Sequence, residues 1–451
     1  MRHGFMVVGT AGCGKTTIFN ILTEALSNVP ESNKYIITKM NPKSITGQEM
    51  FGVMNSVGEW EPGIFSEIWK AKNAKSNKDK CNWICCDGPV DAIWIENLNT
   101  VLDDNKILTL ANAERIPMLD TTKMTFEVEN LRNASPATVS RNGIVFVSDT
   151  DLYWEPLFET WIKDRNDRAS LTPPCNPEEE KWIKTLLVKY FRHKSFDNQT
   201  TTDPAQKAVF YFMRKNFTVP MESPEVVKTT MMINLLTACI REYTAPNSPY
   251  DPIDAELFEK LWCFCFAWAI GGLFEANERQ KFHKEVLERV NAALPQISAQ
   301  RANFDKETVF DYWVNPRSRQ WENWKPQEWT APRRMVFSQL LIPTTDSARA
   351  EYIVEKIRSL DEMRSDKRKE VGLLNTLLVG GAGTAKTSII LMNSTRLPDE
   401  YAFKRINFSF YTLPHNFQES IEGEVEKKNA KNYRPFQDKK LVVFLDDFSM
   451  P

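Results

Sequence analysis

The sequence predicts an α/β fold in which two similar cores are separated by an all-helical region. A glycine-rich loop follows a short apolar run at residues 5–17 and again at 375–388, and each loop precedes an apolar run that ends in aspartate. Between them, residues 152–303 carry aromatic and aliphatic side chains at spacings of three and four, which predicts helices. Strands that alternate with helices after such a loop form a parallel sheet in a three-layer αβα core.

The first loop, GTAGCGKT at residues 9–16, matches the pattern G-x-x-x-x-G-K-[ST] at every required position. Phe5–Val8 before it predicts a buried strand, and Thr17–Leu26 after it predicts a helix. Glycines let the backbone N–H groups of such a loop point at phosphate oxygens, beside the positive end of the helix. The alternative is a chance match in a glycine-containing turn. The predicted nucleotide ligands are Gly9, Gly12, Cys13, Gly14, Lys15, Thr16 and Thr17.

An aspartate follows a predicted strand further along the same core. Trp83–Cys86 is apolar and ends in Asp87. A carboxylate at this end of a strand faces the Mg²⁺ held beside the phosphates, so Thr16 and Asp87 are predicted metal ligands. Gly88 stands where a glutamate that polarises the attacking water usually follows.

The remaining elements of the first core follow from periodicity and from turn residues. A helix is predicted where apolar residues have helical spacing, and a short helix where proline opens a segment that glycine closes. The predicted strands are 35–38, 124–128 and 143–147, and the predicted helices are 93–110 and 135–141.

Composition excludes several classes of protein. Lys plus Arg is 57 against 59 for Asp plus Glu, so the net charge of −2 gives no support for nucleic acid or an acidic membrane as a partner. The eight cysteines are irregularly placed and predict buried thiols. The longest apolar stretch, Leu261–Phe274, is too short to span a membrane. The abrupt ends of the sequence suggest a piece of a longer protein.

The second loop, GGAGTAKT at residues 380–387, departs from the pattern only where Ala385 replaces the last glycine. It is supported by repetition, because the spacing of Asn, Thr and Phe at 41, 46 and 51 recurs at 407, 412 and 417. Residues 375–379 and 441–445 predict the two strands of this core. The predicted nucleotide ligands are Gly380, Gly383, Thr384, Ala385, Lys386, Thr387 and Ser388, and the predicted metal ligands are Thr387 and Asp446.

These features predict four regions: a nucleotide-binding core at 1–151, a helical lid at 152–303, a connector at 304–345 and an incomplete second core at 346–451. The connector holds Trp313, Trp321, Trp324 and Trp329. We predict that these tryptophans pack on their neighbours, although four exposed tryptophans would also suit peptide binding.

The segment 87–112, together with Asn41–Thr46 and Ser135–Arg141, resembles the second AAA+ module of a dynein heavy chain. Ile342–Asp346, the second loop and Leu445–Pro451 resemble the start of the third module, in a form typical of axonemal members. The resemblance implies tandem AAA+ P-loop NTPase modules with an all-helical lid between them, within a ring motor that moves on microtubules.

The resemblance also implies roles for individual residues. The first loop would bind ATP or ADP with Mg²⁺ and hydrolyse little or none, because Gly88 lacks a carboxylate. Asp447 stands at the equivalent position of the second site, a regulatory ATP site whose turnover stays open. Arg141 resembles an arginine finger that reaches the ATP of the preceding module, and the alternative is that it caps its helix or pairs with a carboxylate. Arg279 is either a γ-phosphate sensor or a solvated lid arginine.

The implied partners are neighbouring AAA+ modules of the same heavy chain, with dynein intermediate and light chains and microtubules contacted through regions outside this chain. The implied location is the cytoplasm and cytoskeleton, in the axoneme of a cilium or flagellum, with no nucleic acid and no membrane as partner. Two alternatives stay open: an ATPase of another AAA+ branch, and a non-catalytic scaffold that bound nucleotide stabilises. In isolation, this stretch would be a poor or inactive ATPase.

Overall fold

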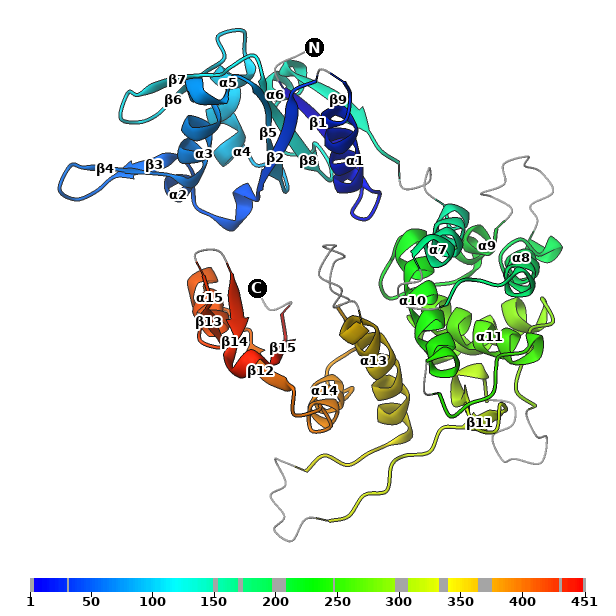
Figure 1. The fold of residues 1–451 in the computed structure, drawn as a ribbon. Helices are drawn as coiled ribbons and strands as arrows, with labels where there is room; N and C mark the ends of the chain where they lie inside the picture. The colour runs from blue at the N-terminus through cyan, green and yellow to red at the C-terminus, as the bar shows by residue number, and fades with distance from the viewer. Residues whose placement is uncertain are drawn as a thin grey trace. The chain divides into compact units, whose positions relative to one another are not determined.

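The computed structural model describes residues 4–30, 32–148, 153–168, 173–196, 208–245, 248–296, 307–331, 340–363, 375–429 and 432–448. The chain divides into two compact units, Met1–Tyr153 and Trp154–Pro451, which we call the first and second units (Figure 1).

The first unit is built on a five-stranded sheet whose strands run parallel in the order β2-β5-β8-β1-β9. The predicted strands are confirmed, and most are longer than predicted. Their bounds are β1 Gly4–Val8, β2 Lys34–Met40, β5 Lys80–Asp87, β8 Thr122–Val128 and β9 Asn142–Phe146.

Helices cover this sheet, and local signals fix where they begin. The predicted short helix at 135–141 is confirmed as α6 (Pro136–Arg141), and Ser135 caps it by accepting a hydrogen bond from the backbone N–H of Thr138. Thr46 and Glu49 form a reciprocal capping box at the start of α2 (Gly47–Phe51). The other elements of this part are α1 Lys15–Ser27, η1 Pro42–Ser44, α3 Ile64–Lys72, η2 Lys75–Asn77 and the hairpin of β3 Gly52–Met54 with β4 Trp60–Pro62.

The predicted helix at 93–110 is wrong in its second half. The chain forms three short turns, α4 (Ala92–Ile95), η3 (Glu96–Leu98) and α5 (Asn99–Leu102), and then a hairpin of β6 (Ile107–Thr109) and β7 (Arg115–Pro117). Lys106 ends a turn in the left-handed region, with φ 51°, and its N–H bonds the carbonyl of Asp103. Leu108 and Leu110 of this hairpin are buried in the core. Their burial explains why apolar residues continue at a spacing that had suggested a longer helix.

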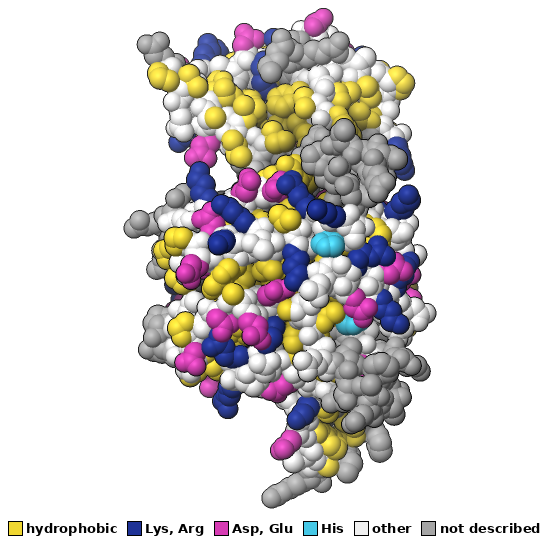
Figure 2. Space-filling model, turned by 90° about the vertical axis from the view of Figure 1, so that its right-hand side faces the viewer, with side chains coloured by type: hydrophobic (Ala, Val, Ile, Leu, Met, Phe, Trp, Pro, Cys, Tyr) yellow, Lys and Arg dark blue, Asp and Glu magenta, His cyan; other side chains and the backbone are white. Residues whose placement is uncertain are grey.

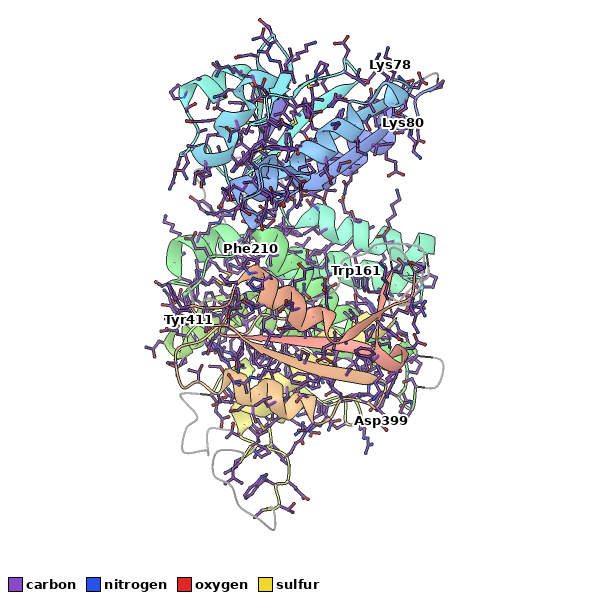
Figure 3. All side chains as sticks on the ribbon, turned by 90° about the vertical axis from the view of Figure 1, so that its left-hand side faces the viewer. Lys78, Lys80, Trp161, Phe210, Asp399 and Tyr411 are labelled. Atoms are coloured by element: carbon purple, nitrogen blue, oxygen red, sulfur yellow. The ribbon has the colours of Figure 1, made fainter. Side chains whose placement is uncertain are left out.

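Apolar side chains of the first unit are partly buried in a core and partly exposed at the surface. One face of the sheet holds a large buried cluster that includes Phe65, Trp69 and Phe126. On another part of the surface, α1 and β9 expose apolar side chains, which gather in the space-filling view of Figure 2: Ile18, Ile21, Leu22, Ile144, Val145 and Phe146. The lysine-rich stretch at 70–80 lies at the surface, where Lys78 and Lys80 project outward (Figure 3).

The second unit begins with helices that pack through aromatic rings. Phe158 stacks on Trp262 with ring centroids 5.4 Å apart, and Trp161 donates from Nε1 to the hydroxyl of Thr237. The prediction of a helical region at 152–303 is confirmed for its described residues, and parts of that region, residues 203–207 among them, lie outside them. The helices are α7 Glu155–Arg168, α8 Pro177–Tyr190, η4 Lys194–Phe196, α9 Val209–Asn216, α10 Glu225–Thr244, α11 Ala255–Gly271, α12 Ala276–Phe282 and the π-helix η6 His283–Glu288.

The connector forms more regular structure than predicted. After η8 (Val309–Asp311), β10 (Tyr312–Val314) pairs with β11 (Trp321–Asn323) in an antiparallel hairpin. The rings of Trp313 and Trp324 lie 5.6 and 5.3 Å from that of Tyr352 in α13 (Thr345–Met363). Packing is therefore confirmed for these two tryptophans and for Trp321, whose ring lies 6.4 Å from that of Phe264, whereas Trp329 is exposed.

In the part of the second core that the structure describes, β12 (Tyr401–Asn407) and β15 (Lys440–Asp446) form one pair of parallel strands. The predicted strand at 375–379 does not form, and Leu377 and Val379 are exposed. In the first unit the equivalent strand β1 pairs with both β8 and β9. The other elements are α14 Lys386–Ser394, α15 Pro414–Glu422, η10 Phe436–Asp438 and the hairpin of β13 Val425–Lys427 with β14 Tyr433–Pro435. No helix among the described residues is long and apolar enough to cross a bilayer.

Candidate functional site

The first loop joins the end of β1 to the start of α1. Gly12 and Gly14 have φ values of 84° and 90°, which a residue with a Cβ adopts only with strain. A Cβ on Gly9 would lie 2.2 Å from the carbonyl oxygen of Val147, so this position needs glycine for close packing. The Nζ atom of Lys15 donates to the carbonyl oxygens of Gly9 at 2.6 Å and Thr10 at 2.9 Å. The lysine is therefore folded over its own loop.

The loop threonine contacts a residue that the sequence analysis missed. The hydroxyl of Thr16 donates to Oε2 of Glu127, at the C-terminal end of β8. Glu127 is only 2% exposed, and its Oε1 lies 2.7 Å from Nζ of Lys39 at the end of β2. A glutamate inside the apolar alternation of 124–128 was the available signal, because burying an unpaired carboxylate is costly.

Asp87 ends β5 and lies directly opposite Glu127 in the sheet. Burial raises the pKa of Asp87, and the negative charge of Glu127 raises it further, whereas Lys39 and Lys15 lower it. The structure therefore gathers two acids, Asp87 and Glu127, and two lysines around the loop threonine, but it places the Thr16 hydroxyl on Glu127 instead of Asp87. Cys13 is buried in the loop, and Thr17 is exposed in the first turn of α1.

The second loop repeats the arrangement. Nζ of Lys386 donates to the carbonyl oxygens of Gly380 at 3.0 Å and Gly381 at 2.7 Å. Ala385 adopts the left-handed region, with φ 61°, where the first loop has Gly14. An alanine costs about 1–2 kcal/mol more than glycine in this region. The substitution therefore keeps the loop shape, at some cost in stability.

The threonine of the second loop contacts the predicted aspartate. The hydroxyl of Thr387 lies 3.0 and 3.1 Å from the two carboxylate oxygens of Asp446, which also accepts from Arg405 at 2.6 Å. The other predicted residues are less enclosed: Gly383 has φ 76°, Thr384 bonds the carbonyl of Gly381, Ser388 is in the first turn of α14, and Asp447 is exposed with φ 53°.

Both sites offer oxygen donors of the kind that Mg²⁺ prefers. These are a threonine hydroxyl and strand-end carboxylates, namely Asp87 and Glu127 in the first site and Asp446 in the second. Among the described residues, no three His, Cys, Asp or Glu side chains form a metal-holding group. Mg²⁺ is commonly held by one or two protein groups together with substrate phosphates, so the residues fit this ion.

Gly88 is closely surrounded. Its φ is 159°, and a Cβ there would lie 2.7 Å from Oδ1 of Asn41. That oxygen accepts from the backbone N–H of Lys43 at 2.9 Å and so caps the turn at Pro42–Ser44. The space beside the end of β5 is therefore occupied by a fixed amide.

The two arginines singled out from the sequence are both held within their own units. Nε of Arg141, in the last turn of α6, forms an ion pair with Asp103, so the structure contains the carboxylate pairing that was one of its two interpretations. Arg279 lies over the rings of Phe310 and Trp268 and donates to the carbonyl of Gly272. The interpretation of Arg279 as a solvated lid arginine is wrong, because Trp268 of the lid and Phe310 of the connector cover its guanidinium.

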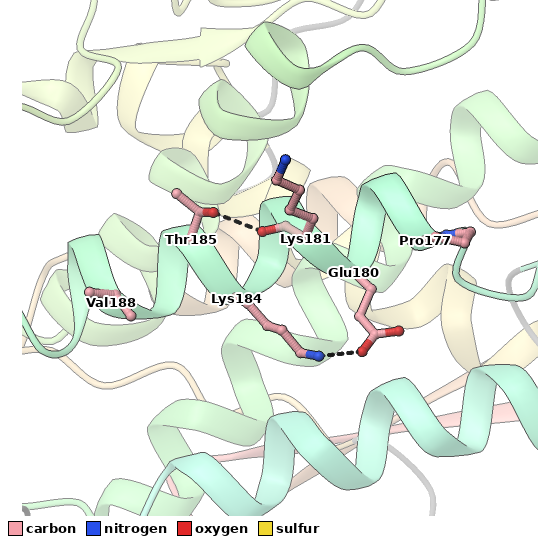
Figure 4. A pocket seen from close by; sticks show the side chains of 6 residues that line it. All are labelled: Pro177, Glu180, Lys181, Lys184, Thr185 and Val188. Atoms are coloured by element: carbon pink, nitrogen blue, oxygen red, sulfur yellow. Dashed lines mark hydrogen bonds and ion pairs between the residues drawn. The ribbon is translucent and has the colours of Figure 1, made fainter.

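A hollow on the second unit is unrelated to either loop. It is lined by one side of α8, where Lys184 pairs with Glu180 at 2.6 Å and the Thr185 hydroxyl donates to the carbonyl of Lys181 (Figure 4). These groups already satisfy one another, so the hollow offers no chemistry comparable with that of the loops.

Three family models together match most of the chain. Residues 4–142 match an AAA domain of the dynein-related subfamily, residues 199–326 match the dynein heavy chain AAA lid domain, and residues 329–451 match the P-loop containing dynein motor region. The chain belongs to the dynein heavy chain family. The resemblance and the predicted class of tandem AAA+ modules with a lid are thus confirmed.

Individual dyneins align along the full length of the chain. The dynein gamma chain of the flagellar outer arm of Chlamydomonas reinhardtii is 37% identical over 458 residues. Dynein axonemal heavy chain 5 of Mus musculus is 35% identical and dynein axonemal heavy chain 8 of Homo sapiens is 34% identical, each over 459 residues. These alignments cover 100% of this chain but only 9% of each of the three dyneins. AAA+ domains with P-loops imply nucleotide binding, and neighbouring modules of the same chain are implied partners.

Proposed function

We propose that the chain is the nucleotide-binding part of an axonemal dynein heavy chain, in the ring of a motor that moves on microtubules. The first loop binds ATP or ADP with Mg²⁺ and turns over little or none of it, and the second loop is a regulatory ATP site. The proposed partners are neighbouring modules of the same heavy chain, with intermediate chains, light chains and microtubules contacted elsewhere. The proposed location is the cytoskeleton of a cilium or flagellum.

One observation carries the nucleotide assignment. In both cores a lysine lies over the loop that precedes it, while the next residue, a threonine, reaches a strand-end carboxylate: Thr16 reaches Glu127 and Thr387 reaches Asp446. The lysine can turn from backbone carbonyls to phosphate oxygens, and the threonine and carboxylate can share a Mg²⁺ shell. Two independent copies of this arrangement are hard to explain as a chance match.

Slow turnover at the first site is supported by the surroundings of Gly88. A water molecule that attacks the γ-phosphate needs an oriented base, and Gly88 provides no carboxylate. Asn41 occupies the adjacent space. At the second site Asp447 supplies a carboxylate after β15, so hydrolysis is chemically open there.

The four predicted regions stay our proposed domain division: a core at 1–151, a lid at 152–303, a connector at 304–345 and a second core from 346. Arg141 is proposed as an arginine finger for the preceding module. Its partial exposure, 30% of the side chain, supports this because the guanidinium can leave Asp103 for a stronger charge.

The nucleotide assignment is tested with fluorescently labelled ADP and Mg²⁺. Because a charge-assisted hydrogen bond contributes about 1.5–3 kcal/mol, we expect Lys15→Ala to weaken binding at the first loop by about 10- to 100-fold. Lys386→Ala should do the same at the second loop. Lys78→Ala, at an exposed turn, is the matched control and should change neither affinity. Unchanged affinity in Lys15→Ala would refute the first site.

Measuring ATP hydrolysis separates the motor proposal from the alternative of a non-catalytic scaffold. The lack of a carboxylate at Gly88 favours the scaffold alternative for the first site. In Lys386→Ala only the first loop remains intact, so we expect ADP and ATP to raise the melting temperature without measurable hydrolysis. Hydrolysis at several per second in this variant would contradict a holding role. Hydrolysis that is lost in Lys386→Ala but present in Lys15→Ala would assign turnover to the second loop.

A further inference from the structure

A basic residue occupies the same place beside the metal-site carboxylate in both cores. In the first core, Nζ of Lys39 lies 2.7 Å from Oε1 of Glu127, whose other oxygen accepts from Thr16. The Glu127 side chain is 1% exposed, whereas that of Lys39 is 27% exposed. The lysine therefore reaches inward from a partly exposed position to a buried carboxylate.

In the second core Arg405 is the basic residue beside the metal-site carboxylate. Its Nη2 atom lies 2.6 Å from Oδ2 of Asp446, the carboxylate that accepts from Thr387. The carboxylates come from different strands in the two cores, β8 in one and β15 in the other. The cation and the loop threonine nevertheless share one carboxylate in each.

The sheet register establishes that the two basic residues are equivalent. Lys39 pairs with Cys85, two residues before Asp87. Arg405 pairs with Phe444, two residues before Asp446. Each basic residue also lies two positions before an asparagine, at 41 and 407, which belongs to the spacing repeated between the cores.

A buried carboxylate needs a compensating charge, and Mg²⁺ would provide one only when it is bound. We propose that Lys39 and Arg405 are resident counter-ions of the metal-site carboxylates, which compete with Mg²⁺ for them and so set how strongly nucleotide binding depends on Mg²⁺. This inference rests on the proposed nucleotide sites. It assigns to both residues a positioning role through the carboxylates, separate from the contacts of the loop lysines.

The proposal predicts a specific pattern of affinities. Without Mg²⁺, Lys39 is the charge that lets polyanionic phosphates approach Asp87 and Glu127, so its loss weakens ADP binding. With Mg²⁺, the bound ion itself neutralises the carboxylates. In Lys39→Met the ion is also no longer repelled by the lysine, so the loss of Lys39 is compensated. The ratio of ADP affinity with Mg²⁺ to ADP affinity with EDTA should therefore rise at least about tenfold in Lys39→Met.

The test measures labelled-ADP affinity with Mg²⁺ and with EDTA, in the 451-residue chain carrying Lys386→Ala so that only the first loop binds. Lys39→Arg keeps the charge and should keep the ratio. Lys34→Met, at the exposed start of the same strand, is the matched control. Melting temperatures supply a second readout: Lys39→Met should lower the melting temperature more in EDTA than in Mg²⁺.

An unchanged affinity ratio in Lys39→Met, with equal loss of stability in EDTA and Mg²⁺, would overturn the proposal and leave an ordinary structural ion pair. Should Lys39→Met fail to fold, Arg405→Met in a Lys15→Ala background tests the same idea at the second loop. Absence of ADP binding in the unaltered chain under both conditions would instead refute the proposed function.

Discussion

Gly88 provides a direct test of how the end of β5 is built. A substitution to alanine adds a Cβ 2.7 Å from Oδ1 of Asn41 at a backbone φ of 159°. Strain in a sparsely populated backbone region costs about 1–3 kcal/mol. Displacing Asn41 from the N–H of Lys43 loses a cap worth about 1 kcal/mol. We therefore expect Gly88→Ala to destabilise the first unit by about 2–4 kcal/mol.

A double-mutant cycle separates the steric part of this cost from the backbone part. Asn41→Gly removes the obstructing amide and itself costs only a few tenths of a kcal/mol as a cap replacement. In that background, Gly88→Ala should cost about 1 kcal/mol less than it does alone.

Hydrogen exchange of β5 and β8 peptides is the assay, because it reports the stability of the first unit without requiring the whole chain to unfold in one step. Equal costs of Gly88→Ala in both backgrounds would refute the contact with Asn41. A cost below about 0.5 kcal/mol would refute the whole account of this position. By the same reasoning, Gly88→Glu should not create a hydrolytic site, since its side chain begins in the space that Asn41 fills.

Two further predictions concern other parts of the chain. Arg141→Ala should leave ADP affinity at the first loop unchanged and should lower the free energy of unfolding by up to about 1 kcal/mol, because the pair with Asp103 is lost. In the complete heavy chain it should slow ATP hydrolysis by the preceding module by about 10³-fold or more, and normal steady-state turnover would exclude the finger. Tyr352→Ala removes a ring that contacts Phe264, Trp313 and Trp324, so we expect urea denaturation to show that the free energy of unfolding of the second unit falls by about 3 kcal/mol. Tyr352→Phe is the control that keeps these contacts. A loss below about 1 kcal/mol in Tyr352→Ala would contradict the packing argument.

Features that depend on neighbouring residues in the sequence were predictable. The loops, the five strands of the first sheet and the cap of α6 follow from short patterns, since glycine, proline and apolar alternation act locally. The predicted helix at 93–110 failed because Leu108 and Leu110 are buried by a hairpin, and apolar spacing alone does not distinguish the two. The strand at 375–379 failed because a strand needs partners, which periodicity does not supply.

The candidate site was predictable only where one segment contains it. Lys15 and Thr16 belong to a contiguous motif, so their contact with the loop followed from spacing. Glu127 was missed because its role depends on β8 lying between β5 and β1, which brings its side chain to Thr16 and Lys39. Strand order is a tertiary property, and no pattern within 122–128 specifies it.

The two cores place the same acidic charge near the loop in different ways. In the first, the carboxylates are Asp87 and Glu127 on adjacent strands, and in the second they are Asp446 and Asp447 in sequence. Each arrangement puts a carboxylate on the loop threonine, so both suit a cation beside phosphates. The second acid differs between the cores in its exposure and its contacts. Glu127 is buried and accepts from Thr16 and Lys39, whereas Asp447 is exposed. Glu127 is therefore engaged by two donors and closed to solvent, whereas Asp447 is open to it. We therefore expect the first core to retain the charge needed for binding and Asp447 of the second core to be the more accessible acid for hydrolysis.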